Sequence, residues 1–79
     1  MFVYILQSEL TGKYYCGQTK DMQHRLSRHN NGLEKFTKHG VPWKIIFSIH
    51  VFDRSEAVQL ESKIKKRGIA RYLNDINFE

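Results

Sequence analysis

The fold is decided by residues 2–18, FVYILQSELTGKYYCGQ, where two short runs of strand-forming residues flank a turn. Residues 2–7 are rich in aromatic and β-branched side chains, and residues 13–18 contain a second run of this kind. The segment between them includes Gly12, a residue type that tolerates the positive φ angles of tight connections. Strands joined by so short a connection usually pair with each other. The sequence therefore predicts an antiparallel β-hairpin at the start of the chain.

A helix is predicted to follow the hairpin, over residues 22 to about 30. Leu26 and His29 lie on neighbouring turns of this helix, together with the methionine at its start. Asp21 is the expected N-cap because its carboxylate can accept hydrogen bonds from the first backbone N–H groups. Gly32 follows the predicted end of the helix and is a typical stop signal.

The second half of the chain predicts one more strand and two more helices. The strand is expected over residues 43–52, with Ser55 as the cap of a helix that ends at Gly68, and a short last helix is expected over residues 69–76. One alternating face of the strand is apolar and consists of Ile45, Phe47, Ile49 and Val51. We therefore expect residues 1–79 to form a single α+β domain, with a three-stranded, largely antiparallel sheet flanked by helices in the order β-β-α-β-α-α.

Composition narrows the class of protein. The single cysteine, Cys16, excludes an internal disulfide and a zinc site built on several thiolates, and it agrees with a reducing compartment such as the cytoplasm. No apolar run is long enough to span a membrane, and the N-terminus reads as a strand, so we expect neither a signal peptide nor a membrane partner. The net charge of +5 on so small a chain favours a polyanionic partner, although many small proteins are mildly basic.

Three tyrosines lie on the predicted hairpin: Tyr4 in its first strand, and Tyr14 and Tyr15 in its second. Side chains alternate along a strand, so Tyr14 and Tyr15 point to opposite faces. We expect one of this pair to pack and the other to face a cleft. Strands favour tyrosine for packing alone, so the residues by themselves leave a structural and a functional interpretation open.

Arg25 and His29 are four residues apart and share one face of the first predicted helix with Leu26. An arginine on this face needs an anionic partner because an unpaired buried charge is costly. A phosphate group would serve, since guanidinium binds phosphate through two parallel hydrogen bonds. A structural salt bridge to Glu61 or another carboxylate would serve equally well. His29 taken alone is more often a structural histidine.

Glu61 leans toward the buried side of the second predicted helix, near Leu60 and Ile64. A partly buried carboxylate is a candidate ligand for Mg²⁺, which prefers oxygen donors and keeps several waters, so that one carboxylate can suffice. The alternative is an exposed ion pair with Lys65 or Lys66 at helical spacing. The residues alone favour this ion pair.

Two basic regions flank these candidate residues, one before residue 45 and one on the later helices. Contacts between such side chains and phosphates give affinity that is independent of sequence and sensitive to salt. A solvated surface is the alternative. The residues expected to contact nucleic acid are Lys20, Arg28, Lys35, Lys38, Lys65 and Lys66.

Taken together, these motifs resemble the GIY-YIG nuclease family over nearly the whole chain. Val3-Tyr4-Ile5 corresponds to the first motif of the family, and Tyr15-Cys16-Gly17 corresponds to the second. The segment from Arg25 to His29 is similar to the family's arginine and following histidine. The stretch from Gly32 to Lys66 is similar to small stand-alone bacterial members.

The chain departs from the family pattern at three places. Val3 replaces the glycine of the first motif and Cys16 replaces the isoleucine of the second, and we expect both to change packing only. Gln18 stands where some relatives carry a lysine, which leaves the path of proton transfer open.

The resemblance implies a metal-dependent endonuclease that hydrolyses phosphodiester bonds in line, without a covalent intermediate. It implies that Arg25 holds the scissile phosphate and that Glu61 binds one divalent metal, Mg²⁺ or Mn²⁺. Tyr4 or Tyr15 would take the proton from the attacking water, with the other orienting it and His29 as a relay. Arg25 and the metal would favour the phenolate form that this role requires.

Nucleic acid is the implied substrate, with DNA favoured over RNA, and repair or processing of structured DNA is the implied setting. A small domain of this kind is also expected to use a protein partner for targeting. The alternative is a nucleic-acid-binding module with the same fold that cuts nothing, or that cuts only with a partner.

Overall fold

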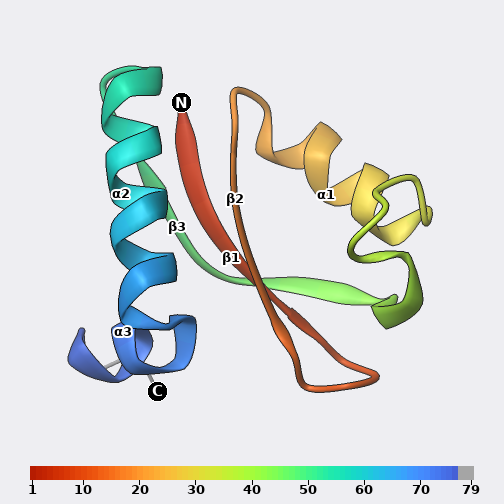
Figure 1. The fold of residues 1–79 in the computed structure, drawn as a ribbon. Coiled ribbons are helices and arrows are strands. Elements are labelled where there is room, and N and C mark those ends of the chain that lie inside the picture. Colours follow the sequence, from red (N-terminus) through yellow and green to blue (C-terminus); the bar gives the residue numbers. More distant parts are fainter. Residues whose placement is uncertain (77–79) are drawn as a thin grey trace.

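The computed structural model describes residues 1–76, and its first two elements are the predicted hairpin (Figure 1). Strands β1 (Phe2–Ser8) and β2 (Tyr14–Thr19) pair antiparallel. Gly12 in the connection has a φ angle of 77°, in the region where glycine is favoured. The predicted hairpin is therefore confirmed, together with the role of its glycine.

Strand β3 (Trp43–His50) pairs with the other side of β1, which gives an antiparallel sheet in the order β2-β1-β3. The strand ends two residues earlier than predicted. Three helices complete the α+β fold: α1 (Met22–Asn30), α2 (Arg54–Arg67) and α3 (Ile69–Asp75). The predicted fold class and order of elements are confirmed.

The predicted alternation along β3 is interrupted by a bulge. Ile5 of β1 pairs with Phe47, but Leu6 pairs with Ile45, so Ile46 is an extra residue in β3. Ile46 and Phe47 consequently pack against the same core. The prediction of one continuous apolar face was wrong, because the extra residue moves Ile45 out of phase with Phe47.

Asp21 caps α1 as predicted, since its carboxylate accepts a hydrogen bond from the backbone N–H of His24 at 3.0 Å. Helix α2 begins earlier than predicted. Its N-cap is Asp53 rather than Ser55, and the Asp53 carboxylate accepts from the backbone N–H of Glu56 at 3.0 Å. Gly68 ends the helix with a φ angle of 96°, as its residue type indicated.

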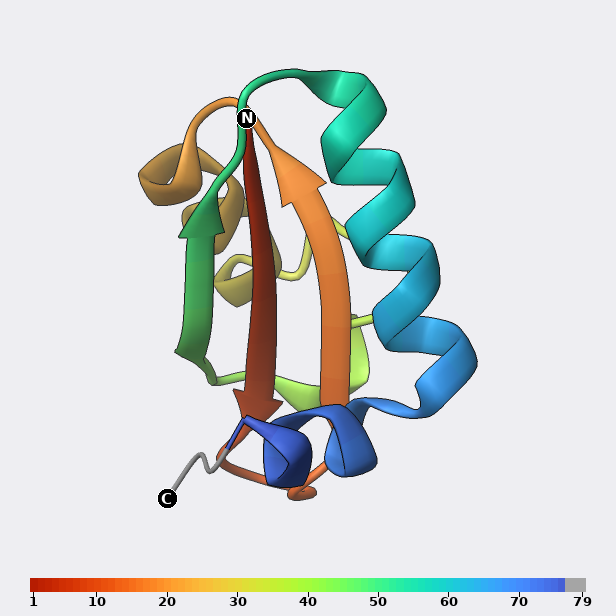
Figure 2. The same ribbon diagram turned by 90° about the vertical axis from the view of Figure 1, so that its left-hand side faces the viewer.

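The sheet separates two layers of helix (Figures 1 and 2). Helices α2 and α3 cover one face, where Val3 and Cys16 are buried against Ile64 and Leu73. Helix α1 and the segment after it, with the short 3₁₀ helix Lys38–Gly40, cover the other face. That face buries Tyr4, Leu6 and Trp43. Tyr4 and Cys16 therefore belong to separate cores. Val3 and Cys16, the two residues that depart from the tyrosine motifs of the family, both lie in the core beneath α2.

In the described part of the chain, no helix combines the length and the apolar character needed to cross a bilayer.

Candidate active site

A chain of buried hydrogen bonds crosses the face of the sheet beneath α1. The Tyr4 hydroxyl lies 3.0 Å from His29 Nε2, and His29 Nδ1 lies 2.7 Å from the hydroxyl of Thr37. All three side chains are buried. A neutral imidazole donates a hydrogen bond from one nitrogen and accepts at the other, so either tautomer satisfies both partners. These hydrogen bonds therefore place two residues of the family motifs, Tyr4 and His29, in direct contact.

The surroundings of His29 favour its neutral form. Burial lowers the pKa of His29 and outweighs the nearby carboxylate of Glu34, which raises it. A neutral ring is also what two hydroxyl partners require, because a protonated imidazole has no acceptor nitrogen.

We expect the free energy of unfolding to fall as the pH drops below about 6.5, the ordinary pKa of histidine. Below that value the unfolded chain binds a proton at His29 that the folded protein, with its lower pKa, does not yet bind. The loss continues until the pH reaches the lowered pKa of the folded state. Chemical denaturation between about pH 5 and pH 8 measures it.

The matched controls for this pH dependence are two histidine variants. His29→Gln should lose the slope in this range, whereas His24→Gln, at an exposed position of the same helix, should keep it. Equal slopes in the wild type and in His29→Gln would show that His29 does not cause the effect.

Gly17 in the second motif makes room for Tyr4. The two residues lie opposite each other on paired strands. A Cβ atom at position 17 would lie 2.6 Å from the Tyr4 hydroxyl oxygen and 2.8 Å from the adjacent ring carbon, closer than real contacts allow. A side chain here would therefore displace the Tyr4 hydroxyl. Nothing in the sequence near Gly17 indicates this role, because it depends on the register that places Gly17 opposite Tyr4.

Tyr15, on the edge strand β2, packs beside the hydrogen-bonded pair of Tyr4 and His29. Its ring centre lies 5.0 Å from that of His29 and 6.3 Å from that of Tyr4. Tyr15 is half-buried, whereas Tyr14 is exposed. Of this pair, Tyr15 is therefore the one that packs, and it does so while keeping part of its ring accessible.

Burial raises the pKa of both Tyr4 and Tyr15. The positive charge of Arg25 lowers both pKa values, as expected, but burial outweighs it. The protein's own groups therefore favour the protonated phenol at neutral pH in both residues. Ionisation of either tyrosine needs positive charge beyond that of Arg25.

Arg25 has a carboxylate partner, and this partner is Glu34 rather than Glu61. The Arg25 Nε atom lies 3.6 Å from the Glu34 carboxylate, whereas the Nε of Arg28 lies 3.0 Å from the same oxygen. Although burial opposes it, the hydrogen bond from Arg28 lowers the pKa of Glu34, with the charge of Arg25 acting in the same direction. Glu34 therefore stays ionised and holds Arg28 firmly and Arg25 loosely.

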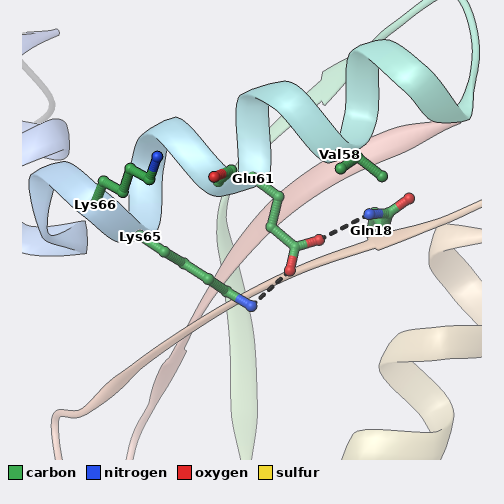
Figure 3. Close-up of a pocket in the computed structure, with 6 residues that line it drawn as sticks. Gln18, Val58, Glu61, Lys65 and Lys66 are labelled. Carbon is green, nitrogen blue, oxygen red and sulfur yellow. Dashed lines mark hydrogen bonds and ion pairs between the residues drawn. The ribbon is translucent and has the colours of Figure 1, made fainter.

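Glu61 lies on α2 and points toward β2, where it contacts Gln18 (Figure 3). One carboxylate oxygen accepts a hydrogen bond from the Gln18 side-chain amide at 3.0 Å, and the other forms an ion pair with Lys65. The Glu61 side chain is only 18% exposed. The expected ion pair with Lys65 is therefore present, and it is made by a carboxylate that is largely buried rather than exposed. The contact with Gln18 could not be foreseen from residues so far apart in the chain.

The donors around Glu61 decide which metal could bind there. Within residues 1–76, no group of three or more His, Cys, Asp or Glu side chains could hold a metal ion. Gln18 turns its amide nitrogen toward the Glu61 carboxylate, while its buried side-chain oxygen points away (Figure 3) and has no hydrogen-bond partner among the described residues. The Glu61 carboxylate is a hard oxygen donor, which fits Mg²⁺ or Mn²⁺ with most of its water retained and does not by itself fit zinc. Glu61, with Gln18 beside it, is therefore the place where such an ion could be held.

Tyr15 joins the two sides of the site. Beyond burial, the charges that affect its pKa include Lys65 and Glu61 from α2 and Arg25 from α1. Tyr15 lies on β2, which within residues 1–76 is an edge strand paired with β1 alone. Tyr15 therefore lies within electrostatic range of an arginine from α1 and of a carboxylate from α2.

The six basic residues expected to contact nucleic acid fall into two groups. Arg28 is paired with Glu34 and Lys65 is paired with Glu61. The other four are exposed: Lys20, Lys35, Lys38 and Lys66. Arg67, from the second basic region, is paired with Asp75. Three of the basic side chains, Arg28, Lys65 and Arg67, are thus paired with carboxylates of the protein itself.

Comparison with known proteins agrees with this geometry. The model of the GIY-YIG catalytic domain matches residues 1–74. A UPF0213 protein of Streptococcus pneumoniae is 34% identical, over 84% of this chain and 67% of its own length. UPF0213 protein YsiG of Lactococcus lactis is 34% identical, over 95% of this chain and 77% of its own length. UPF0213 protein OB0043 of Oceanobacillus iheyensis is 32% identical, over 99% of this chain and 91% of its own length.

None of these three names states an activity, and no solved structure matches the chain significantly. The family match, by contrast, includes every residue of the candidate site, from Tyr4 to Lys65. The chain belongs to the GIY-YIG family, a family of nucleases.

Proposed function

We propose that this protein is an endonuclease that hydrolyses phosphodiester bonds in DNA with one divalent metal ion. The observation that supports this most directly is that Tyr15, on the edge strand β2, lies within electrostatic range of Arg25 from α1 and of Glu61 from α2. These residues are respectively a proton carrier, a phosphate-binding cation and an oxygen ligand for a metal. Together they can take the proton from an attacking water, stabilise the charge on the phosphate and hold a metal ion for the leaving oxygen.

Arg25 is the residue proposed to hold the scissile phosphate. Its contact with Glu34 is long, while Arg28 keeps Glu34 paired, so Arg25 can turn to a phosphate without leaving the partly exposed Glu34 carboxylate unpaired. Its planar guanidinium then binds two phosphate oxygens and stabilises the charge that builds up on them during attack.

Glu61 is the residue proposed to hold the metal, with Lys65 giving up its ion pair when the ion binds. A Mg²⁺ or Mn²⁺ ion in this position would supply positive charge to the departing oxygen. Gln18 can keep its hydrogen bond to one oxygen of Glu61 and so hold the carboxylate in place.

Tyr15 is better placed than Tyr4 to take the proton from the attacking water. Tyr4 is fully buried with its hydroxyl against His29, whereas Tyr15 is partly accessible. Tyr15 must first lose its own proton, and the charges of Lys65 and Arg25 lower its pKa in that direction against the effect of burial. A metal ion held by Glu61 would lower this pKa as well. Tyr4 and His29 then orient Tyr15 by packing against it.

The setting of the activity is also part of the proposal. We place it in the cytoplasm, with a role in repair or in processing of structured DNA, and with a protein partner that brings so small a domain to its target. DNA is preferred to RNA as the substrate, and the exposed lysines Lys20, Lys35, Lys38 and Lys66 contact its phosphates.

A second candidate function is binding without cleavage. Two observations favour it: both oxygens of Glu61 are engaged within the protein, and burial keeps both tyrosines protonated. A protein of this kind would hold nucleic acid with the same surface and leave its phosphodiester bonds intact.

Cleavage of a panel of labelled DNAs and RNAs separates these functions. Duplex, flap, fork, junction and single-stranded substrates are incubated with Mg²⁺, with Mn²⁺ or with EDTA. The endonuclease should cut at least one DNA with a metal ion and none with EDTA. Binding without cutting in either metal would favour the second function, and cutting in EDTA would exclude a metal requirement.

A further inference from the structure

A groove of about 310 Å³ lies next to the candidate active site, away from the pocket at Glu61. Four aromatic residues line it, Tyr14, Tyr15, Phe36 and Trp43, together with the basic side chain of Lys13 and the imidazole of His39. Tyr15 belongs both to this groove and to the cluster with Tyr4 and His29. A group attached to a phosphate at Tyr15 can therefore reach the groove.

One wall of the groove is rigid and already has its polar groups satisfied. The indole N–H of Trp43 donates to the backbone oxygen of Thr37 at 2.8 Å, and Trp43 is 6% exposed. Gly40 packs so tightly on this indole that a Cβ atom would lie 2.6 Å from the ring. The Ser8 hydroxyl donates to the backbone oxygen of Gly40. This wall is preformed, as a binding surface needs to be.

Another side of the groove is formed by Phe36, which is 83% exposed. Its ring contributes little to the core, since most of its surface faces solvent. Tyr14 beside the same groove is also exposed, and Lys35 Nζ lies 6.0 Å from the centre of the Phe36 ring. Exposed aromatic rings next to cations form the kind of surface on which nucleobases stack while the backbone is held electrostatically.

We propose that this groove binds an unpaired nucleobase next to the phosphate to be cut, with the base stacked on Phe36. This inference rests on the proposed function, because it takes Tyr15 to be where the scissile phosphate lies. A base inside a duplex is covered on both faces by its neighbours, so it cannot stack on a protein ring unless it leaves the helix. The preferred substrate is therefore a single strand, a flap or a frayed end rather than an intact duplex.

The test is the binding of a single-stranded oligodeoxynucleotide in EDTA, where no metal-dependent cutting occurs. Phe36→Ala should weaken binding roughly tenfold, in the range measured for loss of one stacked base. The matched control is Phe52→Ala, because Phe52 is 87% exposed and does not line the groove. It should bind as the wild type does. Both rings are so exposed that neither variant should unfold.

Two further measurements locate the base. Trp43 is the sole tryptophan, so stacking in the groove should change the intrinsic fluorescence of the wild type when an oligothymidine is added. An oligonucleotide of abasic sugars should bind the wild type and Phe36→Ala equally, since it has phosphates but no base to stack.

The outcomes separate this inference from the proposed function. Equal single-strand binding by Phe36→Ala and the wild type would overturn the base site, even if the protein cuts DNA. An equal loss on intact duplex would overturn it as well. Binding that depends on Phe36 in a protein that cuts none of the panel would support the base site and contradict the nuclease.

Discussion

Replacing Glu61 with glutamine should lower metal-dependent cleavage by at least roughly 10²–10³-fold, the effect of removing one transition-state stabilising group. The amide keeps the size of the side chain and can still meet Gln18, but it lacks the negative charge that a divalent cation needs. Binding of DNA in EDTA should not weaken, because the substitution removes a negative charge that repels phosphates. Single-turnover cleavage with Mg²⁺ and Mn²⁺ measures the first effect, and a binding titration measures the second.

The matched control is Glu9→Gln, which removes the same charge at an exposed position of the hairpin turn. It should cleave as the wild type does. Loss of stability cannot account for the Glu61→Gln result, since its partner Lys65 is 53% exposed and such pairs contribute about 0–1 kcal/mol. If Glu61→Gln cuts at the wild-type rate, Glu61 does not hold a catalytic metal.

Local signals in the sequence were enough to predict most of the fold. Gly12, Asp21 and Gly68 act through their own backbone or through the nearest N–H groups, and all three do what their residue types indicate. Asp53 shows the limit of this approach. Asp53 and Ser55 are both good caps, and the choice between them depends on where the chain leaves β3, which is a property of the whole fold.

The features that could not be predicted involve residues from different elements. The bulge at Ile46 reflects the pairing of β3 with β1, and no pattern within β3 reveals it. Glu34 lies in an irregular segment, so nothing in its surroundings identified it as the partner of Arg25 and Arg28. The role of Gly17 became visible only once Tyr4 was placed opposite it.

The sequence motifs identified the residues of the candidate site, but they did not predict how these residues are arranged. The sequence paired Tyr4, Tyr15, Arg25, His29 and Glu61 with roles taken from a family. In the structure, Tyr4 and His29 are joined by a buried hydrogen bond. Tyr15 lies where charged side chains of both α1 and α2 affect its pKa. This arrangement is what distinguishes the two tyrosines, because burial separates a residue that positions others from one that can meet water.

Replacing Arg25 with alanine should lower the rate of cleavage by roughly 10²–10³-fold and weaken DNA binding by much less. Binding is shared among several cations, whereas Arg25 is the one placed against the phosphate to be cut. The fold should survive, because Glu34 keeps its shorter contact with Arg28. The matched control is Lys20→Ala just before the same helix, which removes an exposed cation and should weaken binding to a similar degree while bound DNA is still cut.

Arg25→Lys separates the two effects that we attribute to this guanidinium. Lysine keeps the positive charge, so the lowering of the Tyr15 pKa and most of the binding should return. It cannot bind two phosphate oxygens in parallel, so cleavage should stay well below the wild-type rate. The pH dependence of cleavage should then shift upward in Arg25→Ala but not in Arg25→Lys. Full recovery of the rate in Arg25→Lys would mean that Arg25 acts through its charge alone, and an unshifted profile in Arg25→Ala would mean that Tyr15 is not the group that takes the proton.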